Sequence, residues 1–192
     1  AVTLTNLANA LGALGDAHEQ KALLERALAI KEKQYGPDHY EIAITLTNLA
    51  NAHGALDDAQ KKALLERALI IMEKHYGPDH YHVAATLGNL ANAHGALGDA
   101  HKKKALLERA LAIKEKHYGP DHYGVAITLD DLANAHGDLG DAHKMKALLE
   151  RALTIKEKHY GPEHYQVAIT LGYLGNVHHD LGDVQEAKAL LE

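Results

Sequence analysis

Residues 63–69 read A-L-L-E-R-A-L, and the recurrence of this string decides the fold. Its other copies begin at Ala22, Ala105 and Ala147, and a truncated copy ends the chain at 189–192. A second string, L-A-N-A, begins at Leu7, Leu49, Leu90 and Leu132, with a relative, L-G-N-V, at Leu174. Successive copies lie 41 or 42 residues apart. This period indicates a 42-residue unit with one residue deleted from the second copy, between Asn51 and Ala63.

The spacing of apolar residues predicts two helices in each unit. In the second copy, Ile42, Leu46 and Leu49 fall on one helical face, and Leu65 and Met72 belong to a second stripe. A short L-D-D or L-G-D turn separates the two helices. One helix pair cannot bury its apolar face alone, so neighbouring pairs must stack into an all-α solenoid.

We expect one continuous array over residues 1–192. Its units are about 1–37, 38–78, 79–120, 121–162 and a truncated 163–192.

The helix-turn-helix unit, the small residue after leucine in L-A-N-A, the L-G-D turn and the E-R-A-L run resemble the tetratricopeptide repeat. The 42-residue unit is longer than the usual 34 or so and is similar to the repeats of kinesin light chain. The resemblance implies a right-handed superhelical solenoid of stacked antiparallel helix pairs. It also implies a non-catalytic scaffold that binds a protein or peptide. The copying of one unit is equally typical of a consensus-like or engineered array.

Composition narrows the classes of partner. The net charge is −6, which disfavours nucleic acid and anionic membranes, since both need a clustered basic surface. The chain has no cysteine, so disulfides and thiolate metal sites are excluded. No apolar run approaches the length of a membrane span, and no signal-like segment opens the chain. A cytoplasmic protein is the expectation.

The string K-H-Y-G-P-D-H-Y at 74–81 joins one unit to the next, and close relatives recur at 33–40, 116–123 and 158–165. Gly77 can end a helix in a left-handed conformation, and Pro78 cannot continue it. Asp79 is predicted to cap the following helix. In the first joint, Asp38 and Glu41 have the spacing of a capping box. This interpretation gives the histidines of the joint no structural role and predicts that they are exposed.

The joint histidines raise the hypothesis of a metal site. The pairs are His75/His80, His117/His122 and His159/His164. A zinc site needs a complete converging ligand set, but Gln34 replaces the first histidine of the first joint, and no H-E-x-x-H spacing occurs. We therefore predict no metal and no cofactor, and histidine-based metal binding stays open as an alternative function.

A second set of histidines follows L-A-N-A on the apolar face. Its members are His53, His94, His136 and His178. They are predicted to be partly buried neutral imidazoles that fill aromatic space. The alternative is a pH switch, because burial lowers the pKa of histidine and would make folding acid-labile.

Asparagines recur on the first helix of each unit, the helix that lines the concave face of such solenoids. The candidate peptide-binding residues are Asn6, Asn9, Asn48, Asn51, Asn89, Asn92, Asp130, Asn134 and Asn176. A column of amides can donate to and accept from the backbone of an extended peptide, and the family resemblance implies this role. The alternative is that these asparagines are carried along with the copied unit and bind nothing. Asp130, Asp131, Asp138 and Asp180 make the C-terminal half acidic, which favours a basic or neutral peptide.

No nucleophile with a base and an orienting group stands apart from the repeat, so no enzyme is predicted. The alternative to a peptide scaffold is a structural or engineered array without an evolved ligand, stacking head to tail through its end faces. Because the deletion rotates a helix by about 100° per residue, we expect a shortened or bulged start to the second helix of the second copy. We also expect the turn before that helix to be the softest in the array.

Overall fold

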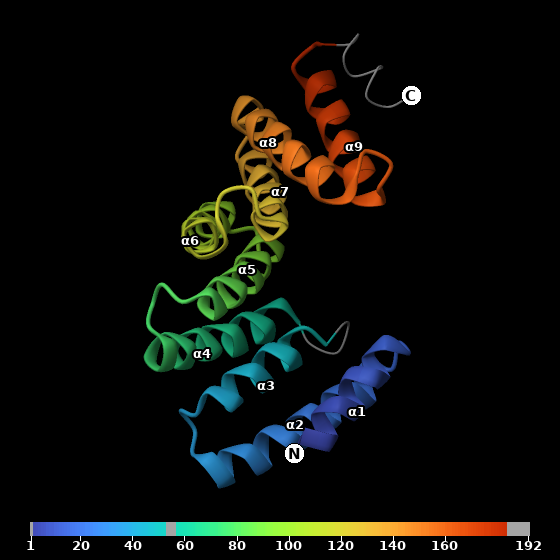
Figure 1. Cartoon of the computed structure of the whole chain (residues 1–192). Coiled ribbons are helices and arrows are strands. Elements are labelled where there is room, and N and C mark those ends of the chain that lie inside the picture. The colour runs from blue at the N-terminus through green and yellow to red at the C-terminus, as the bar shows by residue number, and fades with distance from the viewer. Residues whose placement is uncertain (1, 53–56, 184–192) are drawn as a thin grey trace. The chain divides into compact units, whose positions relative to one another are not determined.

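The structure is a computed structural model that describes residues 2–52 and 57–183 (Figure 1). Within these ranges it contains helices and no strand. The helices are α1 (Val2–Ala13), α2 (Ala17–Tyr35), α3 (Tyr40–Ala50), α4 (Asp58–Tyr76), α5 (Tyr81–Ala96), α6 (Ala100–Tyr118), α7 (Tyr123–Asp138), α8 (Ala142–Tyr160) and α9 (Tyr165–Asp180). Odd-numbered helices are the first helices of their units and even-numbered helices are the second, as the apolar stripes predicted.

Each joint ends a second helix as the Gly-Pro pair predicted. Gly77 has a φ of 88°, and its N–H donates to the Glu73 carbonyl at 2.9 Å. The equivalent glycines Gly36, Gly119 and Gly161 have φ values of 82°, 87° and 85°. A side chain is strained in this left-handed region, which explains why the position is glycine in every joint.

The prediction that Asp79 caps the next helix is wrong, because His80 occupies the N-cap. His80 has an extended backbone, and its Nδ1 accepts the backbone N–H of His82 at 3.3 Å. The capping box of the first joint is also wrong. Asp38 accepts instead from Lys74 Nζ at 2.6 Å, and the helix is capped by His39. Histidine thus has a structural role in the joint that the sequence interpretation denied it.

Ring stacking explains why histidine stands at this cap. The tyrosine that ends the preceding helix stacks on the cap imidazole, with ring centroids 4.6 Å apart for Tyr76 and His80 and 4.4 Å apart for Tyr160 and His164. The other joint histidine also stacks, since the centroids of Tyr40 and His75 are 4.8 Å apart. Aspartate could cap the helix but could not make this aromatic contact.

The second helices start alike, so the predicted shortened or bulged start in the second copy is wrong. α2, α4, α6 and α8 each have 19 residues, and each is capped by an aspartate. Asp57 caps α4 through the Gln60 N–H at 2.7 Å. The first helix is short instead, because α3 has 11 residues where α5, α7 and α9 have 16. The turn expected to be softest lies largely in 53–56, outside the described residues.

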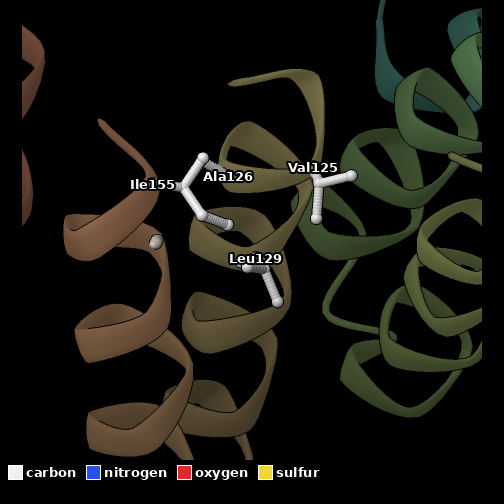
Figure 2. Close-up of a cluster of buried hydrophobic side chains, with 5 residues drawn as sticks. Val125, Ala126, Leu129 and Ile155 are labelled. Atoms are coloured by element: carbon white, nitrogen blue, oxygen red, sulfur yellow. The ribbon is translucent and has the colours of Figure 1, made fainter. Parts of the chain in front are cut away.

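The chain forms two compact units, Ala1–Gly98 (unit 1) and Asp99–Glu192 (unit 2). In unit 1, Ala8, Leu24 and Leu49 form a buried cluster. In unit 2, the cluster of Figure 2 contains Val125, Ala126, Leu129, Ala152 and Ile155. The first cluster joins α1 and α3 to α2, and the second joins α7 to α8, which is the burial that the helix-pair pattern requires. The prediction of one continuous array concerns the two units together and stays a prediction.

Polar contacts also connect successive copies within each unit. In unit 1, Arg67 Nη2 lies 2.6 Å from Glu32 Oε1. The equivalent contact in unit 2 joins Arg151 to Glu115, also at 2.6 Å. These pairs are partly exposed and therefore fix orientation more than they add stability.

Along the part of the chain that the structure describes, no helix is both long and apolar enough to cross a bilayer.

Candidate functional site

The predicted peptide-binding residues all lie on first helices. Asn6 and Asn9 are on α1, Asn48 is on α3, and Asn51 is its C-cap. Asn89 and Asn92 are on α5, Asp130 and Asn134 on α7, and Asn176 on α9. Asn6, Asn9, Asn51, Asn92 and Asn176 are exposed, whereas the others are partly buried. Their positions leave most of these amides accessible to a ligand.

In unit 1, three of the predicted asparagines meet at one hollow. Its volume is about 550 Å³. The described lining residues are Ala50, Asn51, Ala52, Asp58, Lys61, Leu65, Asn89, Asn92, Ala93 and Ala96. We call this the unit 1 hollow.

The hollow combines amides, small apolar side chains and one ion pair. Among the described residues, the amides of Asn51, Asn89 and Asn92 have no hydrogen-bonding partner. Four alanines leave space around them. Lys61 Nζ and Asp58 Oδ1 are 3.1 Å apart at the opposite wall. The surface is therefore neutral overall and offers hydrogen-bond donors and acceptors beside apolar area.

The hollow lies where the second copy departs from the others. Asp57 holds the cap position of Asp16, Asp99 and Asp141, so the residue missing from this copy is the glycine that precedes the cap elsewhere. Leu56 stands before Asp57, whereas Gly98 and Gly140 precede the other caps. α3 correspondingly ends at Ala50. The sequence revealed the deletion but not which helix it would shorten.

The equivalent place in unit 2 has different chemistry. Lys103 corresponds to Lys61, and its Nζ lies 2.7 Å from Asp138 Oδ2. Ala96 of the hollow is the equivalent of Asp138 in the preceding copy. Asp131 stands where α3 and α5 have Asn48 and Asn89. Burial, assisted by the neighbouring Asp130 carboxylate, raises the pKa of Asp131 above its ordinary value. The prediction that the C-terminal half of the first-helix surface is acidic stays a prediction, since Asp138 is paired with Lys103.

Asp130 is occupied by an internal network. Its carboxylate contacts Lys156 Nζ, and Thr170 Oγ1 lies 3.4 Å from its other oxygen. Burial raises the pKa of Asp130 despite the opposing effect of Lys156. The Asp130 side chain is 15% exposed and that of Lys156 is 1% exposed. The structure thus separates Asp130 from the exposed asparagines with which the sequence grouped it.

The sequence interpretation missed three lysines of the second helices that reach a threonine 14 residues later. Lys31 Nζ donates to Thr45 Oγ1 at 2.9 Å, Lys114 to Thr128 at 2.6 Å and Lys156 to Thr170 at 2.8 Å. The recurring Lys-x13-Thr spacing is the signal that could have revealed them. In the second copy Met72 replaces the lysine, and Thr47 stands where α7 has Asp130. Lysine and its carboxylate partner are thus both exchanged in that copy.

The second set of histidines is buried as predicted. His94, His136 and His178 are each 5% exposed, while His53 lies outside the described residues. His136 Nδ1 lies 3.3 Å from Asp141 Oδ2, and His178 Nδ1 lies 3.3 Å from Asp183 Oδ2. The acid-labile folding inferred from burial stays a prediction.

The joint histidines do not assemble a metal centre in the described part of the chain. Across residues 2–52 and 57–183, no group of three or more histidine, aspartate or glutamate side chains is placed to hold a metal ion.

Comparison with known proteins identifies the family. Sequence models of the tetratricopeptide repeat match residues 1–61, 104–158 and 132–192, and a second model with the same description matches 42–82 and 83–123. No curated protein sequence matches the chain.

Solved structures resemble the chain over 98% of its length. Two are structures of nearly identical TPR-like repeats from a Podosopora anserina protein described as a kinesin light chain, one of them a variant. Each is 27% identical and covered over 90% of its length, with TM-scores of 0.85 and 0.84. BtubC (BKLC) from P. vanneervenii is 23% identical, is covered over 75%, and has a TM-score of 0.86. These likenesses confirm the all-α solenoid fold.

Tetratricopeptide repeats are in general protein-interaction scaffolds, and the fold is typically non-enzymatic. The matching sequence models cover most of the chain and agree with the observed helix pairs. The chain belongs to the tetratricopeptide repeat family.

Proposed function

We propose that the chain is a non-catalytic scaffold that binds an extended peptide along its first helices, with the unit 1 hollow as the main contact. The observation that carries the proposal is the convergence of Asn51, Asn89 and Asn92 on that hollow. Each amide can donate to one backbone carbonyl and accept from one backbone N–H, which suits an extended segment. The alanine surface accommodates a ligand side chain of moderate size.

The charges around the hollow indicate which peptide fits. The only ionised groups among its described lining residues, Asp58 and Lys61, neutralise each other. The corresponding region of unit 2 carries Asp131, while Asp138 is paired with Lys103. A neutral or basic segment therefore meets no repulsion in either unit, whereas an acidic segment would be repelled in unit 2.

A peptide-display selection tests the proposal. The parent chain is compared with a variant carrying Asn51→Ala, Asn89→Ala and Asn92→Ala. A control carries His101→Ala and His143→Ala, which remove exposed side chains of second helices outside the hollow. Peptides selected on the parent should keep binding to the control and weaken at least tenfold on the hollow variant. Equal binding to all three proteins, or no enrichment on the folded parent, would refute the proposal.

Head-to-tail stacking without a peptide ligand is a second candidate, favoured by the surface of α1. Leu7 is 50% exposed, whereas its equivalents Leu49, Leu90 and Leu174 are each 3% exposed. A second copy of the chain could cover this leucine. Light scattering after size-exclusion chromatography should then show a concentration-dependent increase in mass that Leu7→Glu abolishes. A monomeric parent at high concentration would exclude this candidate.

A further inference from the structure

The N-caps of four first helices share one unusual acceptor. The Nδ1 atoms of the cap histidines accept backbone N–H groups two residues ahead, at 3.1–3.3 Å. The pairs are His39 with Glu41, His80 with His82, His122 with Gly124 and His164 with Gln166. The residue that follows each cap histidine by two differs in every copy, so the imidazole and not its donor is the repeated feature.

This bond requires a neutral imidazole. Nδ1 accepts only while its lone pair is free, which places the ring proton on Nε2. Protonation turns Nδ1 into a donor that faces another donor, and the cap is lost. The new positive charge also sits at the positive end of the helix dipole.

The second helices are capped by a different chemistry. Asp16, Asp57, Asp99 and Asp141 accept backbone N–H groups at 2.7–3.1 Å. The Lys144 N–H donated to Asp141 is the main cause that holds the pKa of that carboxyl below its ordinary value. A carboxylate keeps its cap down to a pH of about 4, whereas histidines in general titrate near pH 6.5.

We propose that α3, α5, α7 and α9 carry proton-sensitive N-caps, so that mild acid loosens the start of these first helices while α2, α4, α6 and α8 keep their caps. Protonation of a cap histidine removes a hydrogen bond from the folded chain, whereas the unfolded chain has no cap to lose. Stability is therefore present at pH 7.5 and is lost toward pH 5.5.

The surroundings of His122 favour this direction. The titratable and charged groups near it are Lys114, His117 and Tyr118 of α6, Asp121 of the joint, Tyr123 of α7, and Arg151, Lys158 and His159 of α8. Two carboxylates contact these cations, since Asp121 lies 3.1 Å from Lys158 Nζ and Glu115 lies 2.6 Å from Arg151 Nη2. Both carboxylates are therefore already paired with a cation, and neither is left to pair with a proton on His122.

The other three caps have comparable neighbours. Around His39 these are Lys31, Tyr35, Asp38, Tyr40, Glu41, Arg67, Lys74 and His75. Around His80 they are His75, Tyr76, Asp79, Tyr81 and His82, and around His164 they are Lys156, His159, Tyr160, Glu163 and Tyr165. Burial and the nearby His80 ring lower the pKa of His82. Asp38 and Glu41 already contact lysines at 2.6 and 2.9 Å.

Thermal unfolding at pH 7.5 and pH 5.5 tests the proposal on the whole chain. The cap variant combines His39→Asn, His80→Asn, His122→Asn and His164→Asn, because asparagine caps a helix without titrating. The control combines His75→Asn, His117→Asn and His159→Asn, which removes joint histidines that are not caps. The Tm of the parent should fall on the order of 10 °C between the two pH values. The control should show the same fall, and the cap variant less than half of it.

An equal fall in parent and cap variant would overturn the proposal, because the buried histidines would then account for the whole effect. Imidazole nitrogen NMR of the parent provides a second measurement that does not depend on the folding of a variant. At pH 7.5 the four cap histidines should carry their proton on Nε2. A proton on Nδ1 of these residues would contradict the proposed caps.

Discussion

At the scale of single residues, one buried position of the second helices is occupied by lysine in some copies and by an apolar residue in another. Lys156 is almost completely buried and is held by Asp130, Thr170 and the Gln166 carbonyl. In the second copy, Met72 occupies the equivalent position and is buried without any charge. Replacing a buried ion pair by apolar groups is often neutral, while removing one partner is costly.

Lys156→Met alone should therefore destabilise the chain by about 3 kcal/mol, since the poorly exposed Asp130 carboxylate loses its cation. Adding Asp130→Thr, which recreates the Met72 and Thr47 combination of the second copy, should return stability to within about 1 kcal/mol of the parent. Urea unfolding of both variants measures this. A double variant no more stable than Lys156→Met would show that the two residues are not coupled.

Asp131 gives a pH-dependent prediction. Burial first and then the Asp130 carboxylate raise its pKa above 3.8 in the folded state, so the folded chain holds this proton more tightly than the unfolded chain. Stability is then lost as the pH rises from 3.8 through the raised pKa, and the loss persists at pH 7.

Asp131→Asn should remove this loss and raise stability by about 1 kcal/mol at pH 7. Asparagine already occupies the position as Asn48 and Asn89. The gain should shrink as the pH approaches 4, and urea unfolding at both pH values checks it. Asp180→Asn, at an exposed carboxylate, is the control and should change little. A gain that is independent of pH would rule out the ionisation of Asp131 as its cause.

At the scale of helices, the sequence predicted what depends on local pattern. Apolar spacing located the helix pairs, and Gly77 with Pro78 located the joint. The prediction that Asp79 is the N-cap was wrong because aspartate is the commoner cap residue in general. Histidine is favoured here by the stacking of Tyr76 on His80, which local pattern does not reveal. The sequence did not predict the hollow, because the hollow depends on which helix the deletion shortens, and local pattern does not decide that. The lysines were missed because that side chain is rarely buried without a partner, and Asp130 is far away in sequence.

Inserting a glycine between Leu56 and Asp57 tests the origin of the hollow. The insertion restores the L-G-D turn of the other copies, so α3 should extend to the length of α5 and fill part of the hollow. Peptides selected on the parent should bind at least tenfold more weakly, while the Tm should rise because the turn regains the glycine that precedes the cap aspartate in the other copies. A crystal structure with peptide titration measures both effects. Unchanged affinity would place the peptide elsewhere.

At the scale of the whole molecule, the repeat makes neighbouring helix pairs depend on each other. Two buried clusters, Ala8 with Leu24 and Leu49, and Ala133 with Leu149, Leu174 and Val177, join helices from two copies, so these helix pairs are not independent cores. The contact of Arg67 with Glu32 between two copies in unit 1 has an equivalent in unit 2, Arg151 with Glu115. Nearest-neighbour coupling of this kind favours cooperative unfolding within each unit, and a single domain over 1–192 stays a prediction.

Tryptophan reporters test that prediction, since the chain contains no tryptophan. Tyr35→Trp reports on unit 1 and Tyr165→Trp on unit 2, and both tyrosines are exposed enough to tolerate the exchange. Fluorescence during urea unfolding should give the same midpoint for both reporters if the units unfold together. Circular dichroism of each variant is the control for altered stability. Two separate midpoints would show that the units unfold independently.

A chain of near-identical copies faces a hazard that ordinary domains avoid, because a helix from one copy can take the place of another. The Lys156 and Asp130 pair, set against Met72 and Thr47, distinguishes correct from exchanged partners. If α4 and α8 traded places, an ammonium group would be buried against Thr47 and a thioether against Asp130, and both mismatches cost free energy. This side-chain position therefore disfavours the exchange of α4 with α8 while the chain folds.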